Sequence, residues 1–261
     1  PSWENDKVGF RKYFDVRNAN DIWGKTTSNM VLDNVGVDTT KSYHKLDNWG
    51  MDILKVGKSL GAGAVALQIN IDGKDTLIRL GKNADITYQQ IANGPVRAIF
   101  ELVYKNWKYS PNADPISVTE RISIWGGQYF FQNEISLTDN NTHLQITTGT
   151  IDFYTDKTTN ILTKSYAALY THAKQSENND KLGIGIITPI QHFGSFGVTS
   201  SESIDITNTF TLNMYAIFPK KYTYRYYAAW EKTDGQFKSK ERFENFLRKE
   251  GLKFTQKVFV E

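Results

Sequence analysis

VRAIFELVY at residues 96–104 and ISVTERISIW at residues 116–125 decide the fold class of this chain. In both stretches, apolar residues stand at alternate positions, a pattern typical of antiparallel strands with one buried face. The residues expected on the buried faces are Val96, Ala98, Phe100, Leu102 and Tyr104 in the first stretch and Ile116, Val118, Ile122 and Ile124 in the second. We predict two half-buried strands, the second with polar groups on its opposite face.

The same β-branched and aromatic composition continues along the chain, interrupted by turn sequences such as TDNN and SENNDK. One helix is predicted at 239–250, with Ser239 as its N-cap, Phe243 and Leu247 on its apolar face and Gly251 as its stop. We expect it to cover the edge or end of a sheet. Strands with one apolar face need a facing sheet, so we predict an all-β protein: a large antiparallel β-sandwich with a C-terminal helix.

The composition limits both the organisation and the partners of the chain. With 261 residues and 39% hydrophobic content, it can bury one large core, and we expect a single domain over residues 1–261. The net charge of +3 gives no reason to expect binding to nucleic acid. With no cysteine, the chain has neither disulfides nor thiolate chemistry. No apolar run is long enough for membrane insertion, and the oligomeric state stays open.

The first residue, Pro1, is not an initiator methionine. This suggests that an upstream segment was removed, either a signal peptide or a cloning boundary. We therefore expect a periplasmic or secreted protein.

Two glycine-rich stretches resemble nucleotide-binding motifs only superficially. GKS at 57–59 lacks the glycine that a phosphate-binding loop needs at the position of Asp52, and GAGAVA at 61–66 lacks the flanking strand and helix. The histidines are too widely separated to form a metal-binding pair in sequence: His44, His143, His172 and His192. We expect neither a cofactor nor a metal site.

The segment YHKLDNWGMDILKVGKSLGAG at 43–63 combines a histidine, a tyrosine, a tryptophan, two aspartates and three lysines with four glycines. Such a mixture is unusual for a segment that only packs. A second polar and aromatic cluster, WENDKVGFRKYFDVRN at 3–18, lies upstream. We predict that side chains from 3–17 and 43–58 converge in one concave site that exposes a tryptophan.

Together these segments resemble a family of proteins from bacterial polysaccharide-degradation loci, long catalogued as a domain of unknown function and associated with oligosaccharide dehydratases of ulvan breakdown. The motifs that carry the resemblance are WEND at 3–6, Phe10, Arg11, Tyr13, RNANDIWGK at 17–25, the 43–63 segment, NGPVRAIFELVY at 93–104 and YYAAWEK at 226–232. The resemblance implies a galactose-mutarotase-like sandwich, an oligosaccharide substrate and removal of water across C4 and C5 of a terminal uronic acid.

This reaction needs a cation beside the substrate carboxylate, a base for the C5 proton and an acid for the departing hydroxyl. Arg11 is the first choice for the cation, because a guanidinium can hold a carboxylate in a bidentate fork. Its rivals are Arg17, Lys45, Lys55 and Lys58. Each of these cations could equally form an ordinary surface ion pair.

His44 is the leading acid or base, since an imidazole titrates near neutral pH. The alternative is a structural histidine that donates to a backbone carbonyl. His172 is the second candidate, and Tyr43 and Tyr13 could transfer protons if a cation lowered their pKa. The expected sugar contacts are stacking by Trp3 and Trp49 and hydrogen bonds from Glu4, Asn5 and Asp52.

Two other functions stay open. An aldose mutarotase or epimerase would need a His/Glu pair, which Glu231 could form with His172 or His44. A non-catalytic glycan-binding module would need the aromatic residues but few acid or base groups. Hydrolysis by two carboxylates has weak support, because no acidic pair stands out in the sequence.

Overall fold

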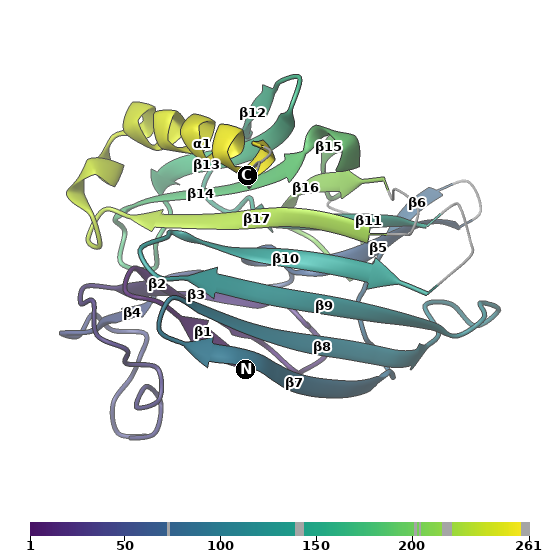
Figure 1. The fold of residues 1–261 in the computed structure, drawn as a ribbon, viewed down its shortest axis with the longest axis horizontal. Coiled ribbons are helices and arrows are strands. Elements are labelled where there is room, and N and C mark those ends of the chain that lie inside the picture. Colours follow the sequence, from purple (N-terminus) through teal and green to yellow (C-terminus); the bar gives the residue numbers. More distant parts are fainter. Residues whose placement is uncertain (72–73, 139–143, 201–202, 204, 216–220, 257–261) are drawn as a thin grey trace, which may run out of the picture.

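The computed structural model is built mainly from antiparallel strands (Figure 1). It describes residues 1–71, 74–138, 144–200, 203, 205–215 and 221–256. The all-β prediction is confirmed. Among the described residues, no helix is long and apolar enough to span a bilayer.

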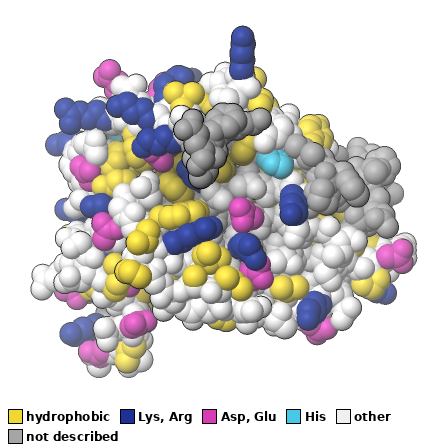
Figure 2. Space-filling view, viewed as in Figure 1, with side chains coloured by type: hydrophobic (Ala, Val, Ile, Leu, Met, Phe, Trp, Pro, Cys, Tyr) yellow, Lys and Arg dark blue, Asp and Glu magenta, His cyan; other side chains and the backbone are white. Residues whose placement is uncertain are grey.

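One layer is an eight-stranded sheet in the order β12-β13-β14-β17-β10-β9-β8-β7, with every neighbouring pair antiparallel. Its strands are β7 (Asp85–Gly94), β8 (Arg97–Trp107), β9 (Ile116–Trp125), β10 (Phe130–Leu137), β12 (Thr159–Leu162), β13 (Tyr166–Lys174), β14 (Lys181–Pro189) and β17 (Lys221–Trp230). Figure 2 shows basic, acidic and apolar side chains interspersed on the face of the molecule in this view.

The opposing layer consists of two smaller antiparallel sheets. The first, in the order β1-β2-β3-β4, contains β1 (Ser2–Glu4), β2 (Val8–Lys12), β3 (Asn20–Lys25) and β4 (Gly50–Asp52). The second, in the order β15-β16-β11-β5-β6, contains β5 (Val65–Ile71), β6 (Lys74–Arg79), β11 (Gln145–Ile151), β15 (Phe193–Val198) and β16 (Thr209–Met214). A bridge between Asn20 and Gly61 joins β3 to the segment that leads into β5.

A single apolar cluster fills the space between the two layers. It contains residues from all three sheets, among them Phe10, Leu67 and Phe131. On β8, the predicted residues Phe100, Leu102 and Tyr104 are buried, as the alternating pattern requires. Val96 is 72% exposed, because it precedes the first residue of β8 and does not belong to the strand's apolar face.

The inward face of β9 also carries a charge that the sequence pattern did not reveal. Glu120 is fully buried, with its Oε2 atom 3.2 Å from the Lys12 ammonium. The Tyr104 hydroxyl donates to Oε2 at 3.0 Å, and the Asn133 amide donates to Oε1 at 2.8 Å. These partners offset the cost of burying the carboxylate.

The helix α1 (Lys240–Thr255) extends past its predicted end. Ser239 caps it as predicted by accepting from the Arg242 N–H, but Gly251 lies inside the helix and packs against the Tyr166 ring. The helix covers the outer face of β13 and β14, so the prediction that it covers a sheet edge or end was wrong (Figure 1). Gly183 makes room for it, since a Cβ there would lie 2.7 Å from Phe243.

Candidate functional site

The candidate site lies on the side of the four-stranded sheet that faces away from the core. Strand alternation directs Phe10, Ile22 and Met51 inward, and the registers place Arg11 opposite Asp21 and Trp23 opposite Asp52 on the other side. Four of the polar residues there, Arg11, Tyr13, Asp21 and Asp52, form what we call the Arg11 cluster. Its members come from β2, β3, β4 and the residue that follows β2.

The Arg11 guanidinium organises this cluster. Its Nη2 atom donates to Asp21 Oδ2 at 2.5 Å, to Asp52 Oδ2 at 3.1 Å and to the Tyr13 hydroxyl at 2.7 Å. The Tyr13 hydroxyl donates to Asp21 Oδ2 at 2.6 Å. Aromatic rings surround the cation, with the Arg11 Cζ atom 4.4 Å from the centre of the Trp23 ring and 5.3 Å from that of Tyr43. Both carboxylates therefore share one cation.

Burial controls the protonation of this cluster. Loss of water and the neighbouring Asp21 charge raise the pKa of Asp52 to about 8, although the Arg11 charge opposes the shift. Burial and then Asp21 also raise the pKa of the Tyr13 hydroxyl. Burial by itself would lower the pKa of Arg11, but the Asp21 carboxylate outweighs it and raises that pKa. Burial therefore keeps the Asp52 carboxyl protonated to a higher pH than an ordinary aspartate.

His44 connects the buried carboxylate to solvent. Its Nδ1 atom lies 3.5 Å from Asp52 Oδ2, while its side chain is 62% exposed. The Tyr43 ring lies 4.4 Å from the His44 ring and 5.3 Å from the Trp23 ring, centre to centre. The Asp52 N–H donates to the Tyr43 carbonyl at 2.9 Å, which fixes the segment over the cluster. Tyr43 thus lies beside Arg11, and His44 lies beside Asp52, which pairs with Arg11.

A pocket of about 290 Å³ lies in the loop between β3 and β4, and Tyr43, the chain neighbour of His44, is part of its wall. Tyr43, Asp47 and Trp49 line one part of it, and the Trp49 ring lies 5.9 Å from the Trp23 ring. No residue of 3–17 is among those that line this pocket. The two segments meet instead in the Arg11 cluster, where Arg11 contacts Asp52 and the Tyr43 ring.

Three residues of the first segment have structural roles instead of facing this site. Trp3 is 5% exposed and packs against Phe10, Phe100 and Phe131 in the core, so its ring cannot stack on a sugar.

The carboxylate of Glu4 pairs with the buried Lys25 ammonium and accepts from the N–H groups of Val31 and Leu32. Asn5 donates to the carbonyls of Trp125 and Gln128. Because these polar groups are already satisfied, neither residue is placed to hold a sugar hydroxyl.

His172 lies apart from the Arg11 cluster, under α1. Its Nε2 atom donates to the Phe237 carbonyl at 2.7 Å, and burial lowers its pKa. Glu231 accepts from the Lys181 N–H at 2.6 Å and makes no contact with a histidine among the described residues. The His/Glu pair of the mutarotase hypothesis is therefore not assembled. His143 lies outside the described residues.

The candidate cations lie in different surroundings. Lys45 is exposed beside His44, and Lys55 lies over the Phe153 ring with its ammonium 4.8 Å from the ring centre. Arg17 pairs with Asp15, and Lys58 lines a separate pocket.

The sequence reasoning missed Asp21 and Trp23, which complete the site. The signal was present in NDIWGK at 20–25, where Asp21 and Trp23 alternate with the apolar Ile22. In the parts of the chain that the structure describes, no group of three or more His, Asp or Glu side chains could hold a metal ion.

A family model described as "Domain of unknown function (DUF4861)" matches residues 1–260. The chain belongs to this family. A relative in sequence is "Uncharacterized protein P7" of Formosa agariphila, 29% identical over an alignment that covers 92% of this chain. The alignment covers 64% of the relative, so the chain spans less than two thirds of that protein.

A likeness to one of the solved structures supports the fold. An α-mannosidase from Enterococcus faecalis superposes with a TM-score of 0.54 over 96% of this DUF4861 chain and 30% of its own, at 9% identity. An α-N-acetylgalactosaminidase variant from Bifidobacterium bifidum gives a TM-score of 0.46 over 96% and 39% of the two chains, at 8% identity. The first likeness supports a shared sandwich architecture.

Proposed function

We propose that this DUF4861 protein is a carbohydrate-active enzyme that removes water across C4 and C5 of a terminal uronic acid in ulvan-type oligosaccharides. The observation that carries the proposal is the His44–Asp52 contact, in which an exposed imidazole rests on a buried carboxyl group. Such a pair is suited to proton transfer at the protein surface. The fold shared with the α-mannosidase and the family resemblance support a carbohydrate substrate.

The His44–Asp52 pair supplies the proton chemistry. Because Nδ1 faces Asp52, Nε2 is the nitrogen left for the substrate. With the Asp52 carboxylate 3.5 Å from Nδ1, Nε2 would be the base that removes the C5 proton. The same proton then passes from Nε2 to the C4 hydroxyl, which leaves as water while the C4–C5 double bond forms.

The remaining residues of the site would bind and orient the sugar. Arg11, whose side chain is 19% exposed, would act on the uronate carboxylate through its charge, although it shares that charge with two aspartates. Tyr43 would hold the departing hydroxyl, and Trp49 would supply the apolar face of the pocket. Lys45 would face the substrate from the exposed side.

The burial of the carboxylates favours elimination over hydrolysis. Hydrolysis by two carboxylates requires both to flank the scissile bond. The Asp21 and Asp52 side chains are only 1% and 3% exposed and hold the same Arg11 nitrogen. A sugar cannot pass between them without breaking the cluster.

A glycan-binding module is the second candidate, favoured by the pocket with Tyr43 and Trp49 on its wall. The test is to incubate the protein with saturated, uronate-terminated oligosaccharides and record ultraviolet absorbance and product mass. An unsaturated product lighter by one water supports the dehydratase. Unchanged mass with a shifted anomeric ratio would indicate a mutarotase, and binding without any product would indicate a binding module.

Two histidine variants make the test specific. His44→Ala should lower turnover by about 10²–10⁴-fold without lowering the melting temperature, because the side chain is exposed. His172→Ala is the matched control and should keep its turnover. It should lose about 1–3 kcal/mol of stability, since the Phe237 carbonyl loses its buried donor. Normal turnover by a folded His44→Ala protein would remove His44 from the mechanism.

A further inference from the structure

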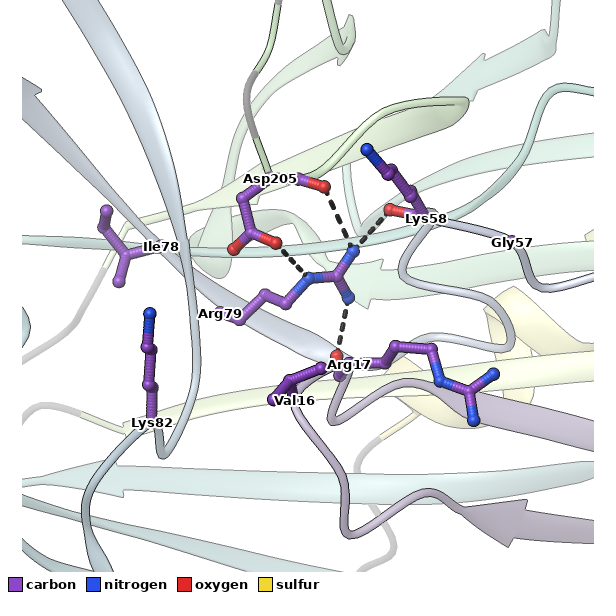
Figure 3. Close-up of a pocket in the computed structure, with 8 residues that line it drawn as sticks. All are labelled: Val16, Arg17, Gly57, Lys58, Ile78, Arg79, Lys82 and Asp205. Carbon is purple, nitrogen blue, oxygen red and sulfur yellow. Dashed lines mark hydrogen bonds and ion pairs between the residues drawn. The ribbon is translucent and has the colours of Figure 1, made fainter.

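A second pocket, of about 310 Å³, lies near the Arg11 cluster and plays no part in the proposed proton chemistry (Figure 3). It is lined by four cationic side chains, those of Arg17, Lys58, Arg79 and Lys82, and by one carboxylate, that of Asp205. Asp15 pairs with Arg17 and Asp205 pairs with Arg79, so the excess positive charge of the pocket is that of Lys58 and Lys82.

Arg79 is the rigid centre of this pocket and is not itself free to bind a ligand. It is 5% exposed, and its Nε atom donates to Asp205 Oδ1 at 2.7 Å. Its Nη1 atom donates to the Arg17 carbonyl at 2.6 Å and to the Ser59 carbonyl at 3.2 Å, and its Nη2 atom donates to the Lys58 carbonyl. Arg79 thus holds the backbone of both flanking loops, while Asp205 balances its charge.

Lys58 and Lys82 are the cations that remain available. Both are exposed, and among the described residues neither has an ion-pair partner. In Figure 3 their side chains lie on opposite sides of Arg79. The Arg79 contacts fix the loop of Lys58 through its carbonyl, so this ammonium extends from an anchored backbone.

One aromatic ring connects this pocket to the Arg11 cluster. The Cζ atoms of Arg11 and Arg17 lie 4.6 Å and 4.0 Å from the centre of the Tyr13 ring. Arg17 also lines the cationic pocket. A ligand that extends from His44 past the Tyr13 ring would therefore reach the cationic pocket on the other side of that ring.

We propose that the pocket of Lys58, Lys82 and Arg17 is a subsite for a second anionic group, a sulfate ester or a carboxylate, on a sugar unit beyond the one that reacts. This inference rests on the proposed oligosaccharide function and extends it to substrates with at least two acidic groups. Lysine ammonium groups suit this role, because they attract oxyanions without a fixed hydrogen-bond geometry.

The test compares ligands that differ only in this second group. Three oligosaccharides of one length would carry a terminal 4-deoxy-uronate, which cannot lose the C4 hydroxyl, and a neighbouring unit that is neutral, sulfated or carboxylated. Calorimetry on the wild-type protein should give roughly three- to tenfold tighter binding for a charged neighbour than for the neutral one. The tighter of the two charged ligands identifies the anion.

The preference should disappear in the Lys58→Ala/Lys82→Ala protein. It should persist in the control Lys157→Ala/Lys164→Ala, which loses the same charge from exposed positions flanking β12. Equal binding of all three ligands by the wild type, or a preference that survives the Lys58→Ala/Lys82→Ala change, would overturn the subsite. Water loss from a singly charged substrate is measured separately, so failure of the dehydratase proposal is distinguishable from failure of the subsite.

Discussion

Replacing Asp52 with asparagine should flatten the dependence of folding stability on pH between about 4 and about 8. The ordinary pKa of this carboxyl is 3.8, and in the folded protein it is about 8. Its stabilising contribution is therefore fully present below the unfolded pKa and is lost as the pH rises through the folded value. An amide resembles the protonated carboxyl and does not ionise, so the variant lacks this loss.

The raised pKa sets the size of the effect. A difference of one in the pKa of Asp52 between the folded and unfolded protein corresponds to about 1.4 kcal/mol of stability. The loss between pH of about 4 and about 8 therefore has an upper limit of about 6 kcal/mol. The Asp52 side chain is 3% exposed, so solvent screening removes little of it. A loss of even one or two kcal/mol is a large part of the stability of an ordinary domain.

Urea denaturation of both proteins at several pH values within this window measures the slope. Asparagine offers one acceptor oxygen where Asp52 has two, which accept from Arg11 and from the Leu54 N–H. The variant can therefore carry a constant offset in stability, but only the slope tests the prediction. Asp33→Asn removes one exposed carboxylate and should keep the wild-type slope. Identical slopes for Asp52→Asn and wild type would refute the claim that burial raises the pKa of Asp52.

Two further predictions concern the packing of the sandwich. Lys12→Met should lower the free energy of unfolding by about 3–5 kcal/mol, because it leaves Glu120 buried without its cation. Adding Glu120→Gln should restore part of this loss in the same urea assay. Gly183→Val should lower the melting temperature through a clash with Phe243, at a cost of about 1–3 kcal/mol, and the shorter side chain of Phe243→Leu should relieve it. For each pair of substitutions, a double variant that is no more stable than the single variant would contradict the contact proposed for that pair.

Local patterns in the sequence were sufficient for the fold class. The period of two along β8 and β9 predicted half-buried strands, and Ser239 predicted where α1 begins. Both features depend on side chains close together in the chain. The predicted end of α1 at Gly251 was wrong, because this glycine lies inside the helix and packs against the Tyr166 ring instead of forming a turn.

The site was only partly predictable. The sequence singled out the segments that carry Arg11, Tyr43 and His44, and the tertiary structure brings them together. The sequence did not reveal that Asp21 would accept from the same Arg11 nitrogen as Asp52. These contacts depend on which strands pair and in which register.

The sequence by itself determined the strand-rich composition, the amphipathic faces and the supply of acid, base and aromatic groups. Only the tertiary structure decided that Glu4 would anchor a loop, that Glu120 would be buried with Lys12, and that His44 would meet Asp52. The physical reason is that alternation fixes which face a side chain occupies but not its partner across the sheet. Partners come from long-range pairing, and burial, which raises the Asp52 pKa, exists only after that pairing is complete.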